Sequence, residues 1–226
     1  FDMVNETFVQ AGGSGGAVPW VLQDHPVATG VQMTAGVILR ILKGSPSCVM
    51  LKHEDCPGLN KLAAIRAASD KGELKHVSIL CGNGGLFLDY EMERGADGAN
   101  TGYAFPDMLC DVVRLSQAGQ REEAHDLFDA HLPLLRYEQQ PGVGLAVRKY
   151  VLMRRGLLAS ASQRQPAAPL TAAARAEVDH LLQRLARLGV IVLRTESALH
   201  GPVQLIGIDD SENPADVARE LAKVEV

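Results

Sequence analysis

The chain has 226 residues and a formal net charge of -5 at pH 7, with 46% hydrophobic and 22% charged residues. This composition is ample for a globular core. The acidic balance argues against nucleic acid as a partner, because phosphate binding needs a basic surface. No apolar run approaches the roughly 20 residues that span a bilayer, so we also expect no membrane partner.

The cysteines indicate a reducing compartment. Cys48, Cys56, Cys81 and Cys110 are dispersed and lack C-x-x-C spacing, which speaks against a zinc site and a disulfide framework. The N-terminus shows no basic region followed by an apolar stretch, so no signal peptide is expected. We therefore predict a cytoplasmic protein that holds no metal and needs no cofactor.

Strands and helices alternate along the first half of the chain. Residues 1–10 resemble the body of a helix, which suggests that the chain begins inside a fold. Short apolar or small-residue runs predict strands at 18–23, 48–51, 77–81 and 98–103. Helical spacing predicts helices at 34–43, 58–70 and 86–94, the second with Leu59, Leu62, Ala63 and Ala67 on one face. Such alternation indicates a parallel sheet covered by helices.

The second half of the chain is predicted to be mainly helical. Helices are expected at 107–118, 120–139, 143–156 and 171–188, with a linker at 163–169. Residues 189–226 look like two strands around a turn and then a helix. We therefore predict three parts: an α/β region at 1–106, a helical region at 107–188, and a hairpin-plus-helix tail at 189–226.

Lys52 is the most informative residue of the chain. It follows the apolar run Cys48–Leu51 and precedes a polar loop. A lysine at the mouth of a buried strand loses part of its hydration, which favours the neutral amine, a nucleophile towards carbonyls. The alternative is that Lys52 extends to solvent or pairs with Glu54 or Asp55.

Polar or small residues follow each predicted strand. In parallel α/β folds, ligands bind at the carboxyl ends of the strands. The strand ends therefore predict a small-molecule site with Lys52 as its nucleophile. The candidate side chains and backbone positions around it are Gln23, Asp24, His25, Glu54, Gly82, Asn83 and Asn100.

Five segments carry a resemblance to a known family: LQDHPVATGVQMT, VMLKHED, ILCGNGG, ERGADGANTGYAFPDML and RKYVLMRRGLL. In this order they resemble the dihydrodipicolinate synthase and N-acetylneuraminate lyase family, over roughly residues 1–187. Members are Schiff-base aldolases and dehydratases on a TIM (β/α)8 barrel with extra C-terminal helices. The resemblance implies an α/β fold comprising the C-terminal half of such a barrel, about four parallel strands, followed by the extra helices and a short α/β tail.

The resemblance also implies roles for single residues. Lys52 matches the lysine that condenses with the carbonyl of pyruvate or another 2-oxo acid. Gly82 matches a glycine near the bound keto acid, and Ala99 lies where the family makes a backbone contact. Gln23 stands at the position of a proton-relaying tyrosine and cannot act as an acid or base. We expect Asp24, His25 or Glu54 to carry protons in its place, with Asn83 and Asn100 binding substrate.

The expected function is that of a Schiff-base-forming lyase, an aldolase or dehydratase, acting on pyruvate or a 2-keto-3-deoxy sugar acid. A half-barrel leaves two sheet edges without partners, so we expect a homo-oligomer. The alternative is a truncated, non-catalytic pseudoenzyme or a module for small-molecule binding or assembly.

Overall fold

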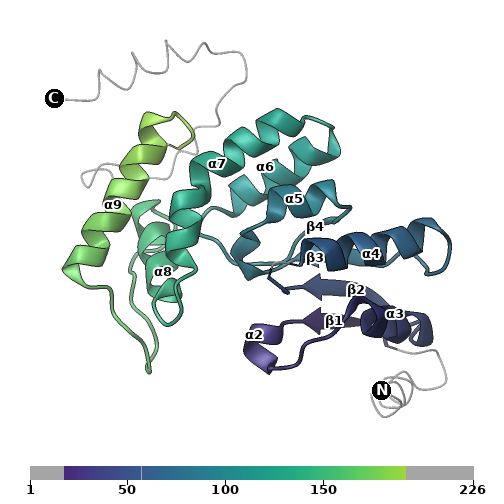
Figure 1. The fold of residues 1–226 in the computed structure, drawn as a ribbon. Coiled ribbons are helices and arrows are strands. Elements are labelled where there is room, and N and C mark those ends of the chain that lie inside the picture. The colour runs from purple at the N-terminus through teal and green to yellow at the C-terminus, as the bar shows by residue number, and fades with distance from the viewer. Residues whose placement is uncertain (1–17, 57, 192–226) are drawn as a thin grey trace. The chain divides into compact units, whose positions relative to one another are not determined.

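The computed structural model describes residues 18–56 and 58–191 (Figure 1). The predicted helix at 1–10 and nearly all of the predicted tail at 189–226 lie outside these residues. The chain divides into two compact units, 1–141 and 142–226. Among the described residues, no helix combines the length and the apolar character needed to cross a bilayer.

The first unit is built on a sheet of four parallel strands. They are β1 (Trp20–Asp24), β2 (Cys48–His53), β3 (Ser78–Cys81) and β4 (Gly98–Ala99), in the order β1-β2-β3-β4 (Figure 1). Gln23 pairs with Lys52 across β1 and β2, and Cys81 pairs with Ala99 across β3 and β4. This parallel arrangement brings the carboxyl ends of the four strands to the same end of the sheet, as the alternating sequence pattern predicts.

Helices connect successive strands, as parallel strands require. The connections contain α2 (Pro26–Thr29), α3 (Ala35–Gly44), α4 (Leu59–Asp70), the 3-10 turn η2 (Asn83–Gly85) and α5 (Leu88–Glu93). The helix α2, a single turn with proline at its start, was not predicted from the sequence. Burial of apolar side chains holds these layers together; the fully buried set includes Ile38, Leu42, Leu51, Leu62, Ile65 and Ile79.

The buried face of α4 differs from the predicted one. Leu62, Ile65 and Ala68 are buried, whereas Ala67 is exposed. The branched side chain of Ile65 removes more apolar surface from water than an alanine can, so it determines which face packs inward.

The fourth strand is shorter than the predicted segment 98–103. It ends at Ala99, and the chain then turns so that Tyr103 lies buried against α7 (Arg121–Glu138), where its hydroxyl is 3.0 Å from His131 Nδ1. The Ala104 N–H donates to Glu138 Oε2 at 2.9 Å, which gives this buried backbone group a partner outside the sheet.

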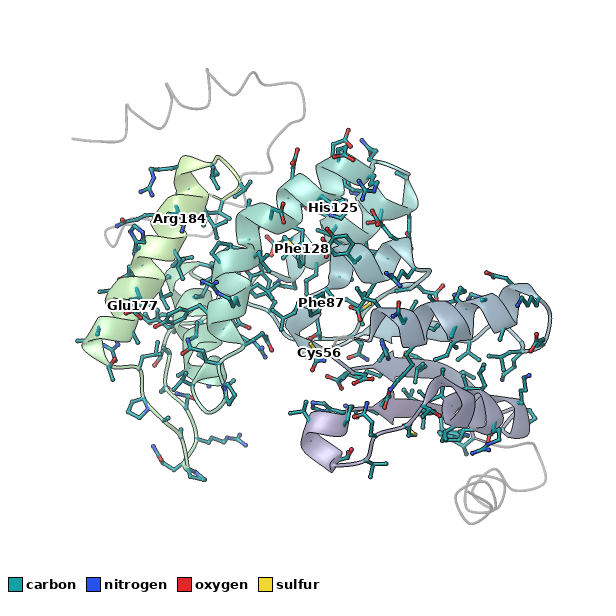
Figure 2. The ribbon with its side chains drawn as sticks, in the orientation of Figure 1. Cys56, Phe87, His125, Phe128, Glu177 and Arg184 are labelled. Carbon is teal, nitrogen blue, oxygen red and sulfur yellow. The ribbon has the colours of Figure 1, made fainter. Side chains whose placement is uncertain are left out.

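Three further helices agree with those predicted for the second half of the chain. α6 (Pro106–Gln117) belongs with α7 to the first unit. α8 (Gly144–Arg154) and α9 (Ala172–Arg187) are the described helices of the second unit. Within the second unit, Arg154 pairs with Asp179, and the Tyr150 hydroxyl donates to the same carboxylate at 3.0 Å. Glu177 and Arg184 mark α9 in Figure 2.

Candidate active site

Lys52 lies near the carboxyl end of β2 and is paired with a carboxylate. Its Nζ is 3.2 Å from Glu54 Oε1, and its side chain is 25% exposed. The structure therefore shows one of the partners that the alternative interpretation of Lys52 named. An ion pair at a solvent-accessible strand end is compatible with a nucleophilic role, because the carboxylate can accept a proton from the ammonium.

Glu54 is held in place by donors from two neighbouring strand ends. The Gln23 side-chain amide donates to Oε1, and the Asn83 N–H donates to Oε2 at 3.3 Å. His25 Nδ1 lies 3.8 Å from Oε1. Burial raises the pKa of Glu54, but the hydrogen bonds from Gln23, Asn83 and Lys52 outweigh it and leave that pKa below its ordinary value. Glu54 is therefore a fixed carboxylate beside the candidate nucleophile.

Gly82 is required by the close approach of Glu54. A Cβ atom at position 82 would overlap the Glu54 side chain, whereas the φ of Gly82, -109°, is open to any residue. The Asn83 side chain strengthens the same contact, since its Nδ2 donates to the Glu54 backbone carbonyl at 2.6 Å. The turn after β3 thus fits around Glu54.

Asp24 belongs to a second cluster of charged residues near the same strand ends. Its side chain is fully buried, and its Oδ2 is 2.8 Å from Lys61 Nζ on α4. Lys61 also lies 2.7 Å from Asp55 Oδ2. Burial lowers the pKa of Lys61, but the hydrogen bonds to Asp24 and Asp55 outweigh it and raise that pKa. Asp24 is therefore committed to a buried ion pair, and the sequence analysis missed Lys61 because α4 gives no local sign of a partner 37 positions away.

The remaining predicted positions also lie at this edge. Ala99 pairs with Cys81, and the Asn100 N–H donates to the Cys81 carbonyl at 2.9 Å, beside Gly82. Figure 2 labels Cys56 in the loop after Lys52 and Phe87 just after the glycine turn. Over residues 18–56 and 58–191, no three His, Cys, Asp or Glu side chains are grouped as metal ligands.

The fold and the site together define a class: a parallel α/β domain, built like part of a (β/α)8 barrel, with a lysine and a carboxylate at the ligand-binding end of its strands. The family model for the dihydrodipicolinate synthetase family matches residues 10–185, and the chain belongs to this family. The resemblance expected from the sequence is thereby confirmed.

Individual relatives agree with this assignment. The chain is 30% identical over 179 residues to an L-2-keto-3-deoxyarabonate dehydratase of Azospirillum brasilense, and 29% identical over 171 residues to a 4-hydroxy-tetrahydrodipicolinate synthase of Chlorobium luteolum. These matches cover 79% and 75% of this chain, and 55% of each relative. The chain thus spans about half the length of these relatives.

A solved structure of dihydrodipicolinate synthase from Rhodopseudomonas palustris is similar to 81% of this chain. The TM-score is 0.73, the sequence identity is 62%, and the match covers 61% of that protein. The predicted partial barrel is consistent with this coverage and with the four parallel strands.

Proposed function

We propose that this chain carries the nucleophile of a Schiff-base-forming lyase that acts on a 2-oxo acid. Family membership supports an aldolase- or dehydratase-type lyase at the level of the family. The observation that carries the proposal is the pair of Lys52 Nζ and the Glu54 carboxylate, 3.2 Å apart beside the Gly82 turn. Asp24 is occupied by Lys61, so Glu54 is the better-placed proton carrier.

The chemistry begins with proton transfer from the Lys52 ammonium to Glu54. The neutral amine then attacks C2 of the 2-oxo acid and forms a carbinolamine. Glu54 returns the proton to the carbinolamine hydroxyl, which leaves as water and gives an iminium ion. The iminium withdraws electrons from C3, so a bond beside it can break or form, by aldol chemistry or by loss of a β-hydroxyl.

In this scheme Gln23 orients the Glu54 carboxylate. An amide cannot exchange a proton at neutral pH, but its N–H holds Oε1 of Glu54. His25, 3.8 Å from the same oxygen, is the second candidate for proton exchange because an imidazole ring can both donate and accept a proton.

Pyruvate and a 2-keto-3-deoxy sugar acid are the proposed substrates, since both present a carbonyl next to a carboxylate. The Azospirillum relative is a dehydratase of such a sugar acid. A cytoplasmic location and assembly into a homo-oligomer complete the proposal.

A non-catalytic module for binding or assembly is the second candidate. The observation that favours it is that β1 and β4 are the outermost strands of the described sheet, because an edge strand offers a template for pairing with another chain. Such a module predicts ligand-dependent stabilisation without covalent chemistry.

Borohydride reduction in the presence of pyruvate, followed by intact mass measurement, separates these functions. We expect a reduced adduct on the wild-type protein and none on the Lys52→Ala variant. The absence of an adduct on the wild type, or an equal adduct on Lys52→Ala, would contradict the lyase proposal.

A further inference from the structure

We propose that the side-chain amide of Gln139 binds a hydroxyl group on the tail of the 2-oxo acid and thereby selects hydroxylated substrates. This inference rests on the proposed function of Lys52. It concerns the part of the substrate that lies beyond the reacting carbonyl.

Gln139 reaches the glycine turn from the end of α7. It is the first residue after that helix, and its backbone N–H donates to the Leu135 carbonyl at 3.1 Å, which anchors it. A Cβ atom at Gly84 would overlap the Gln139 side-chain amide. The amide therefore lies directly on the α-carbon of Gly84, which has a left-handed φ of 69°.

Gly84 belongs to the same turn that fixes Glu54. The turn begins at Gly82, against the Glu54 side chain, and continues through Asn83, whose N–H donates to Glu54 Oε2. Lys52 lies on β2, and the turn follows β3, the adjacent strand. Adjacent strands are about 4.8 Å apart. Three further carbons beyond C2 extend about 4 Å, a length comparable with this strand spacing.

The amide of Gln139 is available for such a contact. In the described part of the chain, its side-chain nitrogen and oxygen have no hydrogen-bond partner, although the residue is half-buried. An amide offers two donors and one acceptor, and leaving them unmatched when the site closes around a ligand is unfavourable. A hydroxyl group can both donate and accept, so it can satisfy either atom.

The neighbouring rim residues have the same neutral character. Asn83 is half-buried and Asn100 is exposed, and both carry uncharged amides at the ends of β3 and β4. Neutral amides on the β3 and β4 side of the site suit a polyhydroxylated tail better than a charged one, since on this side a charged tail would lose hydration without gaining an opposite charge.

The test compares two substrates that share the reacting carbonyl and differ in the tail. Pyruvate has no tail, whereas 2-keto-3-deoxy-L-arabonate has a hydroxylated one. The variant is Gln139→Met, which keeps the side-chain length over Gly84 and removes the amide. The matched control is Gln140→Met, because the exposed Gln140 amide donates to the Tyr137 carbonyl at 2.9 Å, a contact within its own helix end.

The quantity measured is the concentration of each keto acid that gives half-maximal borohydride trapping. For Gln139→Met we expect this concentration to rise about five- to tenfold with the arabonate, because one hydrogen bond is lost. With pyruvate it should change by no more than about twofold. Gln140→Met is expected to match the wild type with both compounds.

If the half-maximal concentration rose equally for both compounds, Gln139 would have a purely structural role. If it were unchanged for the arabonate, Gln139 would not contact the substrate. Either result overturns this inference while leaving the Lys52 proposal intact, provided that the wild type is trapped by pyruvate. A wild type that pyruvate does not trap contradicts the proposed function itself, and this inference with it.

Discussion

Lys52 and Lys61 lie near the same end of the sheet, yet their surroundings differ. Lys61 is 2.8 Å from Asp24 and 2.7 Å from Asp55, and it is largely buried. Among the described residues, Lys52 forms an ion pair with one carboxylate, that of Glu54 at 3.2 Å, and its side chain is 25% exposed. Lys52 lies on β2 itself, whereas Lys61 reaches Asp24 and Asp55 from α4.

The difference shows what separates a structural cation from a candidate nucleophile. Two carboxylates hold Lys61 as an ammonium, which raises its pKa and removes it from nucleophilic chemistry. The single partner of Lys52 is itself held by Gln23 and Asn83, so it can exchange a proton without losing its position. Four predictions can break or sharpen this comparison.

Glu54→Gln is expected to have the largest effect. It removes the proton acceptor beside Lys52 while keeping the shape of the side chain, so the rate of pyruvate trapping should fall about a hundredfold. The matched control is Asp55→Asn, which changes the neighbouring carboxylate on the Lys61 side and should leave the rate within about threefold. Equal losses for the two variants would show that Glu54 has no special role.

Lys61→Met should be the most destabilising of the lysine variants. It leaves the buried Asp24 carboxylate without its ammonium partner, a change that costs about 3 kcal/mol, whereas Lys52→Met breaks a partly exposed pair and should cost less than about 1 kcal/mol. Urea unfolding of both variants measures the free energies. A larger loss for Lys52→Met would reverse the assignment of the structural cation.

Gly82→Ala tests the contact between the turn and Glu54. The added methyl group would overlap the Glu54 side chain, so the carboxylate must move, and we expect trapping to slow about tenfold, as when a positioned acid or base is displaced. Gly36→Ala in α3 is the control, because only Thr34 Oγ1 lies near its Cβ, at 3.9 Å. A Gly82→Ala protein with wild-type trapping would show that the position of Glu54 is unimportant.

The smallest expected effect is the change with pH in the stability that Glu54 and Asp55 contribute to the fold. Hydrogen bonds, opposed by burial, lower the pKa of both Glu54 and Asp55. Each carboxylate therefore contributes stability above its ordinary pKa, and that contribution is lost as the pH falls through the lowered value.

Urea unfolding at two pH values measures this dependence. Glu54→Gln and Asp55→Asn should each cost about 1 kcal/mol at pH 6 and less at pH 3. A cost that does not change between these pH values would contradict the lowered pKa values.

The sequence predicted those parts of the site that depend on local pattern. Apolar runs ending in polar residues located the strand ends, and with them Lys52, Glu54 and Gly82. The extent of β4 was overestimated because Tyr103 finds a buried partner in His131, a contact between distant segments that local propensity does not contain.

Long-range contacts account for what the sequence did not predict. Lys61 and Gln139 lie on or just after helices whose local sequence indicates only packing. Their importance follows from Asp24 and Gly84, which the fold brings against them. The face of α4 was mistaken for a similar reason, since the alanines of that helix fit several faces equally well.

The central claim is that Lys52, and not Lys61, forms the imine. Peptide mapping by tandem mass spectrometry after borohydride reduction with pyruvate tests it most directly. We predict that the reduced adduct lies on Lys52 and that Lys61 remains unmodified. An adduct on Lys61, or one distributed evenly over surface lysines, would contradict the account.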